Sequence, residues 1–265
     1  MSSPFTIAAL QQDIAWSDKQ ENLLTTAHNL NRIRRGTDLV VLPELFTTGY
    51  IADATLLPQL AETNDGHTVD DLHRWADYFH FAIAGSFLAT DGHGNFYNRG
   101  FFVEPGGEKY FYDKHHLFSM STEADLFTPG ERISRPVRYR GWNIKLLICY
   151  DVRFPVWCRK VDNDYDILLF PANWPSARLS QFRQLLAARA VENNAIVVGC
   201  NRIGSDDAGE YPEGGSAIYD LQGREVSTAD EYGNLYATFD RDRFVASRDR
   251  FPTYRDADPF RLLDL

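Results

Sequence analysis

The sequence predicts an α/β layered domain, because short apolar strands alternate along the chain with amphipathic helices. Its composition is that of a folded globular protein, with 44% hydrophobic and 24% charged residues among 265. No internal repeat, low-complexity segment or Pro/Ser/Gly-rich linker divides the chain. We therefore expect a single domain over residues 1–265.

The strands are predicted from short apolar or alternating runs that are bounded by turn residues. Pro105-Gly106-Gly107 separates two such runs and predicts a hairpin. The expected strands lie at residues 5–10, 39–42, 81–88, 97–103, 110–112, 143–148, 166–170, 195–200, 216–219 and 235–239.

Three helices are predicted between these strands. Ser17 with Gln20 gives a capping-box signal for the first, which should end near residues 34–36. The second begins at about Thr68 and has an apolar stripe at helical spacing. The third is expected at residues 180–193.

Charge and cysteine usage exclude several classes of protein. The net charge of -10 argues against a nucleic-acid partner, since such proteins usually carry a basic surplus. No signal sequence and no apolar run of the roughly 20 residues that a membrane helix needs are visible, so a cytoplasmic protein is expected. The three cysteines form no C-x-x-C pair, which argues against a disulfide framework or a zinc cluster.

The common catalytic motifs are also missing. The chain has no H-E-x-x-H, Walker A, G-x-G-x-x-G or G-x-S-x-G sequence. Metalloprotease, P-loop, dinucleotide-binding and serine-hydrolase functions therefore lose support.

Polar residues just past buried strands are the remaining candidates, because functional residues of α/β domains collect there. Glu44 follows one such strand, Cys149 another and Cys200 a third. A buried carboxylate is costly unless it is paired, so Glu44 is either a general base or the partner of a structural cation. Free cysteines are often small buried core residues, and spacing alone does not choose between Cys149 and Cys200.

Residues 112–117 place a cation and two imidazoles between apolar residues. Lys114 near a thiol would favour the thiolate and bind developing negative charge. His115 or His116 would instead serve as the base of a Cys–His peptidase. A solvated turn without a catalytic role, in a binding protein, is the third alternative.

Three segments, in this order, resemble the nitrilase superfamily of carbon-nitrogen hydrolases: Leu42-Pro43-Glu44-Leu45-Phe46, Tyr112-Asp113-Lys114-His115-His116-Leu117-Phe118 and Ile148-Cys149-Tyr150-Asp151-Val152-Arg153-Phe154-Pro155. The resemblance covers nearly the whole chain. It implies an α-β-β-α sandwich of two mixed sheets with helices on the outer faces. It also implies a homodimer and no metal or cofactor.

The resemblance implies a role for each motif residue. Cys149 would be the nucleophile, Glu44 the general base and Lys114 the cationic partner. Glu123 best matches a fourth, supporting Glu, although Asp125 is close in sequence. The backbone N–H of Tyr150 would help to stabilise the oxyanion.

Within the superfamily the chain looks like the bacterial omega-amidases, which deamidate 2-oxo acids bearing a terminal amide, such as 2-oxoglutaramate and 2-oxosuccinamate. Residues 151–157, 172–175 and 199–202 carry this resemblance. True nitrilases usually have Cys-Trp-Glu where this chain has Cys149-Tyr150-Asp151, so a nitrile substrate is not expected. Deaminated glutathione, the substrate of a sister group, stays open.

An anionic substrate also needs a cation in the pocket. Arg153, close to the nucleophile in sequence, is the first candidate, with an ion pair to Asp151 as its structural alternative. Arg178 is a second candidate. By motif position, the other expected pocket residues are Phe118, Asn173 and Trp174.

Overall fold

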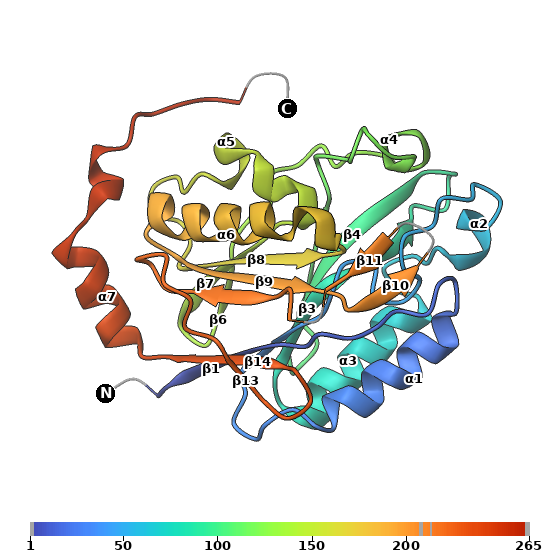
Figure 1. Cartoon of the computed structure of the whole chain (residues 1–265), viewed down its shortest axis with the longest axis horizontal. Helices are drawn as coiled ribbons and strands as arrows, with labels where there is room; N and C mark the ends of the chain where they lie inside the picture. Colours follow the sequence, from blue (N-terminus) through green and yellow to red (C-terminus); the bar gives the residue numbers. More distant parts are fainter. Residues whose placement is uncertain (1–2, 207–208, 213, 263–265) are drawn as a thin grey trace.

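Two β-sheets packed face to face form the centre of the computed structural model, which describes residues 3–206, 209–212 and 214–262 (Figure 1). Helices cover both outer faces, with α5 and α6 over one sheet and α1 and α3 over the other. The α-β-β-α sandwich of two mixed sheets expected from the sequence is confirmed.

The larger sheet has seven strands, and its middle strands β1, β2 and β3 run parallel while the outer ones are antiparallel. In spatial order they are β13 (Thr228–Ala229), β14 (Leu235–Phe239), β1 (Phe5–Ala9), β2 (Leu39–Val41), β3 (Ala82–Thr90), β4 (Phe96–Val103) and β5 (Lys109–Asp113).

The smaller sheet has five strands around the parallel set β7, β8 and β9. In spatial order they are β12 (Ala217–Tyr219), β9 (Ile196–Asn201), β8 (Ile167–Ala172), β7 (Trp142–Leu146) and β6 (Val137–Tyr139). A separate hairpin consists of β10 (Gly204–Asp206) and β11 (Gly209–Tyr211).

The helices are long where they cover a sheet and short where they shape loops. The α-helices are α1 (Lys19–Leu30), α2 (Leu57–Leu60), α3 (His67–Phe79), α4 (Glu123–Leu126), α5 (Pro155–Cys158), α6 (Leu179–Asn193) and α7 (Arg241–Arg250). The 3₁₀-helices of the described residues are η1 (Cys149–Arg153), η2 (Ser176–Arg178) and η3 (Thr253–Asp256). None of the helices in the described part of the chain is long and apolar enough to cross a membrane.

Alternating side chains explain the layers. In β8, Ile167 and Leu169 join the core between the two sheets, whereas Leu168 and Phe170 pack with residues of α6. Successive side chains of a strand point to opposite faces, so a strand that is apolar throughout needs cover on both. The continuous apolar runs of the sequence therefore become the parallel strands of a buried sheet.

The parallel strands also set the position of the loops that follow them. Glu44 lies three residues beyond the end of β2, Cys149 three residues beyond β7, and Asn173 directly after β8. Because both sheets direct these loops to one end of the sandwich, side chains far apart in sequence meet there.

The boundaries of the first helix differ from the prediction. Asp18, not Ser17, caps α1, because its side chain accepts a hydrogen bond from the backbone N–H of Glu21. The helix ends at Leu30 and not near residues 34–36. The next residue, Asn31, caps this end, because its side-chain amide donates to the carbonyl of Ala27.

Candidate active site

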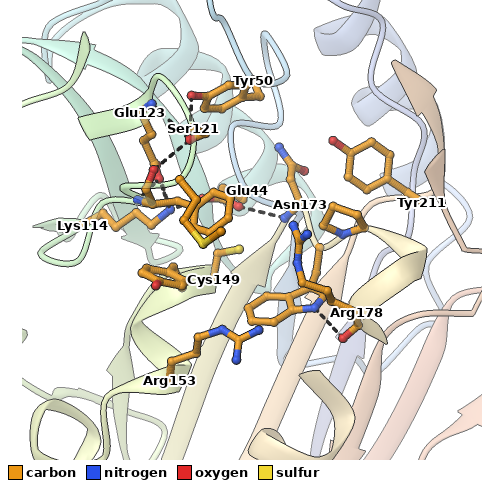
Figure 2. Close-up of a pocket in the computed structure, with 15 residues that line it drawn as sticks. Glu44, Tyr50, Lys114, Ser121, Glu123, Cys149, Arg153, Asn173, Arg178 and Tyr211 are labelled. Atoms are coloured by element: carbon orange, nitrogen blue, oxygen red, sulfur yellow. Dashed lines mark hydrogen bonds and ion pairs between the residues drawn. The ribbon is translucent and has the colours of Figure 1, made fainter. Parts of the chain in front are cut away.

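A cavity of about 460 Å³ opens at the end of the sandwich where these loops meet (Figure 2). Figure 2 shows Lys114, Glu44 and Glu123 on one side of it, with Cys149 beside them. All the site residues predicted from the sequence line this cavity: Glu44, Lys114, Phe118, Glu123, Cys149, Tyr150, Arg153, Asn173 and Trp174.

Lys114 lies between two carboxylates. Its Nζ is 2.9 Å from Oε1 of Glu44, and 2.7 and 3.0 Å from the two carboxylate oxygens of Glu123. All three side chains are at least 95% buried. The neighbouring Asp125 is exposed, whereas the side chain of Glu123 is buried and contacts Lys114.

Uncharged N–H groups also donate hydrogen bonds to both carboxylates. Asn98 in β4 donates its side-chain N–H groups to Glu44 at 2.8 Å and to Glu123 at 3.3 Å. The backbone N–H of Asn173 donates to Oε2 of Glu44 at 2.8 Å, and that of Phe118 to Oε2 of Glu123 at 2.7 Å. Buried ions persist only when their remaining lone pairs are satisfied in this way.

The two carboxylates keep Lys114 charged. Burial alone would lower the pKa of this amine, but Glu123 and Glu44 outweigh it and hold the pKa well above its usual value. The cluster therefore presents the Lys114 ammonium to the cavity between the side chains of Glu44 and Glu123.

Cys149 begins the 3₁₀-turn η1 with a positive φ of 42°. A residue with a side chain rarely adopts this conformation, and such strain is typical of residues held for a function. The thiol side chain is buried, and the first backbone N–H groups of the turn, including that of Tyr150, have no partner within it.

The surroundings of the Cys149 thiol favour its protonated form. Burial raises the pKa of Cys149 well above its usual value, and the nearby Glu44 carboxylate raises it further. Lys114 and the backbone N–H of Asn173 lower it, but by less. Lys114 thus lowers the pKa of the thiol, as expected from the sequence, but burial and Glu44 raise this pKa by more. Attack by this sulfur requires that a base accept its proton.

The other two cysteines have core positions. Cys200 lies between the sheets, with its sulfur 3.0 Å from the carbonyl oxygen of Val41. Cys158 donates to the carbonyl of Asp151 at 3.3 Å, and burial raises its pKa to about 12. Both are fully buried, and neither lines the cavity. Geometry thus distinguishes Cys149 from Cys200, which spacing could not do.

His115 and His116 have hydrogen-bond partners outside the cavity lining. His116 binds the buried carboxylate of Asp151 through its Nδ1 at 2.8 Å, and the Nδ1 of His115 lies 2.6 Å from the carbonyl oxygen of Gly130. Neither lines the cavity, so the Cys–His alternative has no geometric support.

Asp151 joins the Lys114 segment to the nucleophile turn. It accepts hydrogen bonds from the Tyr112 hydroxyl at 2.9 Å and from the backbone N–H of Ile148 at 3.1 Å, in addition to those from His116. The ion pair considered between Asp151 and Arg153 does not form. Arg153 instead donates to the side-chain oxygen of Gln181 at 2.7 Å.

Aromatic and cationic side chains form the rest of the cavity wall. The Arg153 guanidinium lies 4.8 Å from the centre of a Trp174 ring, and that of Arg178 lies 5.4 Å from the Phe118 ring. No carboxylate among the described residues pairs with either arginine. Both polar atoms of the Asn173 side-chain amide are shielded from solvent and lack a hydrogen-bond partner in the described structure.

A family model of the carbon-nitrogen hydrolases matches residues 6–249. The chain belongs to the carbon-nitrogen hydrolase family. Its sequence is 41% identical to omega-amidase YafV of Escherichia coli over 97% of this chain and 98% of that one. It is 31% identical to a 2-oxoglutaramate amidase of Bacillus subtilis, over 95% and 97% of the two chains.

A solved structure has the same architecture as this carbon-nitrogen hydrolase. It is a CN-hydrolase superfamily protein of Xanthomonas campestris that carries an arsenic adduct in its active site. The TM-score is 0.90 at 34% identity, over 98% of this chain and 99% of that chain. The resemblance to the nitrilase superfamily and to its omega-amidases is thereby confirmed, as is the assignment as an enzyme that cleaves amide C–N bonds.

Several residues of this carbon-nitrogen hydrolase site were not predicted from the sequence. Asn98 lies in β4 beside Arg99, and nothing in the sequence distinguishes its buried amide from that neighbour's polar side chain as a site residue. Tyr50 donates to or accepts from Ser121 at 3.2 Å, which connects two cavity loops. Tyr211 lies on the β10–β11 hairpin, where no apolar pattern marks it. The further lining residues are Met120 and Pro175.

The described part of this carbon-nitrogen hydrolase contains no group of three or more His, Cys, Asp or Glu side chains arranged to hold a metal ion. In the cavity, Lys114 instead pairs with Glu44 and Glu123. The other charged residues of the lining are Arg153 and Arg178, which have no carboxylate partner among the described residues.

Proposed function

We propose that this enzyme hydrolyses the terminal carboxamide of small 2-oxo acids, such as 2-oxoglutaramate and 2-oxosuccinamate, to a carboxylate and ammonia. The observation that carries the proposal is the buried Glu44–Lys114–Glu123 ion-pair cluster beside the Cys149 thiol, in a cavity that also holds two unpaired arginines. The omega-amidase and 2-oxoglutaramate amidase relatives support the same substrate class.

In the proposed acylation, Cys149 is the nucleophile and Glu44 the general base. Glu44 accepts the thiol proton as the sulfur attacks the amide carbon, which agrees with the raised pKa of the thiol. Lys114 and the backbone N–H of Tyr150 stabilise the oxyanion, and each such donor typically contributes about 10²–10³ in rate. Glu44 then returns the proton to the leaving nitrogen, so that ammonia departs and a thioester remains on Cys149.

In the proposed deacylation, a water molecule replaces ammonia. Glu44 takes one proton from the water as its oxygen attacks the thioester carbon, and the collapse of the second oxyanion expels the sulfur, which regains the proton. Glu123 supports both steps by holding the Lys114 ammonium in place through its two contacts at 2.7 and 3.0 Å. The cycle uses no metal or cofactor.

The proposed substrate specificity rests on the cations of the cavity. Arg153 binds the substrate carboxylate, with Arg178 as the second candidate, since neither guanidinium has an acidic partner in the described structure. Phe118 and Trp174 form apolar walls beside these cations. The unpaired side-chain amide of Asn173 is suited to donate a hydrogen bond to the 2-oxo oxygen.

The test is ammonia release from a panel of amides by the wild type and by Cys149→Ala. The panel contains 2-oxoglutaramate, 2-oxosuccinamate, deaminated glutathione, glutamine, a neutral aliphatic amide and a simple nitrile. We expect release from the 2-oxo-acid amides that is lost in the variant. Activity confined to deaminated glutathione or to the neutral amide would move the substrate assignment. Release that survives in Cys149→Ala would overturn the mechanism.

Two further parts of the proposal concern the state of the enzyme in the cell. We propose that it acts in the cytoplasm, where its three cysteines stay reduced, and that it forms a homodimer. Light scattering on the purified protein tests the second statement, and a monomer at micromolar concentration would contradict it.

A further inference from the structure

The cavity has one wall that the catalytic residues do not explain. Tyr211 ends the β10–β11 hairpin and lies on the same side of the cavity as Asn173 and Arg178, across from Lys114 in the view of Figure 2. The side chain is almost completely buried, and its hydroxyl donates to Oδ1 of Asp206 at 3.2 Å. The Tyr211 side chain thus lines the cavity while its hydroxyl is bonded to the hairpin.

A fully buried arginine fixes the position of this ring. Arg202 follows β9, and its guanidinium carbon lies 4.3 Å from the centre of the Tyr211 ring. The guanidinium pairs with Asp206 on the hairpin and with Asp13 at 2.9 Å on the loop after β1. It also donates to the carbonyl of Ile14 at 3.0 Å.

This arrangement restricts the motion of Tyr211. Removing a guanidinium from water is costly unless carboxylates and carbonyls replace the water, so Arg202 has little freedom to move. Tyr211 stacks on this immobile cation and is bonded to the same carboxylate that the cation binds. Its ring is therefore a rigid wall and not a mobile lid.

The same hairpin also supports the turn that carries Arg178. The carbonyl oxygen of Glu210 accepts a hydrogen bond from the Ser176 hydroxyl at 2.9 Å, and Ser176 begins the 3₁₀-turn η2 that ends at Arg178. The Tyr211 wall and the Arg178 cation are thus positioned by one element.

We propose that Tyr211 is a specificity-determining residue that limits the length of the acyl chain, and that Arg202 and Asp206 are positioning residues that hold its ring. The inference rests on the proposed function, since the scissile carbonyl must lie at Cys149 while the carboxylate reaches an arginine. In this proposal the ring lies beside the acyl chain, and a substrate with one more methylene group displaces it in order to meet both requirements. One methylene typically changes the specificity of a pocket by about 10–200-fold.

The experiment compares kcat/KM for the ω-amides of four-, five- and six-carbon 2-oxo acids in the wild type, Tyr211→Phe and Tyr211→Ala. We expect Tyr211→Ala to raise the ratio of the six-carbon to the five-carbon substrate by about tenfold or more. Tyr211→Phe should keep most of the wild-type selectivity, because the ring remains stacked on Arg202. Tyr232→Ala, a substitution at a half-exposed tyrosine that does not line the cavity, is the matched control and should leave the ratio unchanged.

The positioning role is tested with Asp206→Asn, which keeps the shape of the side chain but weakens its pairing with Arg202. We expect this variant to shift the same ratio in the same direction as Tyr211→Ala, by a smaller factor. We expect no further shift when it is added to Tyr211→Ala, since the wall it holds is then absent. A purely structural role would lower activity on all chain lengths alike and would add to the effect of Tyr211→Ala.

The outcomes separate this inference from the proposed function. If the wild type cleaves 2-oxo-acid amides but Tyr211→Ala has the wild-type length profile, the wall is disproved and the proposed function stands. If the wild type cleaves none of them, the proposed function fails instead. A shifted profile in Tyr211→Ala with an unchanged one in Asp206→Asn overturns the positioning role alone.

Discussion

The two sheets contribute different chemistry to the candidate active site. The seven-stranded sheet supplies the charged groups, because Glu44 follows β2 and Lys114 follows β5. The five-stranded sheet supplies the thiol and the loop facing it, because Cys149 follows β7 and Asn173 follows β8. The site therefore exists only when the two sheets are packed together.

The two halves are also held in place by different forces. In the first, Lys114 pairs with two buried carboxylates, so electrostatic attraction sets the geometry. In the second, a backbone φ of 42° at Cys149 and the hydrogen bonds of Asp151 set it. A substitution in the first half changes charge, whereas one in the second half changes position. The predictions below test this distinction.

The largest effects are expected in the charged half. Glu44→Gln and Lys114→Ala should each reduce kcat/KM for 2-oxoglutaramate by at least about 10³-fold, because the proposed base or the proposed oxyanion donor is lost. Lys114→Ala leaves two carboxylates buried without a cation and should also lower the free energy of unfolding, by about 3–5 kcal/mol.

Steady-state kinetics and urea denaturation measure the two effects. Glu44→Gln should lower the midpoint urea concentration less than Lys114→Ala, since its side-chain oxygen still accepts a hydrogen bond from Lys114 although its NH2 group cannot accept one from the backbone N–H of Asn173. Asp125→Asn, a change to an exposed carboxylate near Glu123, is the control and should alter neither quantity. Activity close to that of the wild type in either variant of the charged half would remove that residue from the mechanism.

A smaller loss is expected when the position of the thiol is changed and its chemistry is kept. Asp151→Asn has nearly the same shape but cannot accept all the hydrogen bonds that the carboxylate receives from Tyr112, Ile148 and His116. We expect kcat to fall by about 10²-fold with a much smaller change in KM, since a shift of about 1 Å in a reacting group costs that much. An increase in KM with kcat unchanged would show that Asp151 acts on substrate binding.

Much of the charged half was predictable from the sequence, and the reason is the strand-end rule. Continuous apolar runs such as residues 39–42 indicate parallel strands, and the polar residue that follows, here Glu44, must lie at the active end of the sheet. The choice of Cys149 over Cys200 required more, because both follow such runs. The resemblance of three sequence segments to the nitrilase superfamily favoured Cys149. The position of Cys200 in the core between the sheets agrees with this choice.

Other features could not be predicted because tertiary contacts create them. Asn98 lies beside Arg99 in the antiparallel strand β4, and only the folded sheet brings it to Glu44 and Glu123. Helix α7 is mostly charged and has no clear apolar stripe. It is held by Phe244 in the core between the sheets and by the ion pair of Arg248 with Asp166 at 2.7 Å.

The positional half also contains the proposed carboxylate site, where a moderate effect is expected. Arg153→Lys should raise KM for 2-oxoglutaramate by about tenfold but leave KM for a neutral amide nearly unchanged, since a lysine cannot reproduce the two parallel hydrogen bonds of a guanidinium. Arg178→Lys measured in parallel assigns the carboxylate to one of the two cations. Arg159→Lys, whose side chain donates to the carbonyl of Glu192 and does not line the cavity, is the control. Equal effects on charged and neutral amides would exclude Arg153 as the carboxylate ligand.

The smallest effect links the two halves through the pKa of the Cys149 thiol. Burial and the Glu44 carboxylate raise this pKa, whereas Lys114 lowers it. Removing the negative charge in Glu44→Gln should therefore lower the pKa, and removing the positive charge in Lys114→Ala should raise it further. The rate of alkylation by iodoacetamide follows the thiolate fraction, so its pH profile should move to lower pH in the first variant and to higher pH in the second. Cys149→Ala corrects for the slow labelling of the buried Cys158 and Cys200. A shift of both profiles in the same direction would mean that the two substitutions act by disturbing the position of the turn, and the separation between a charged half and a positional half would be wrong.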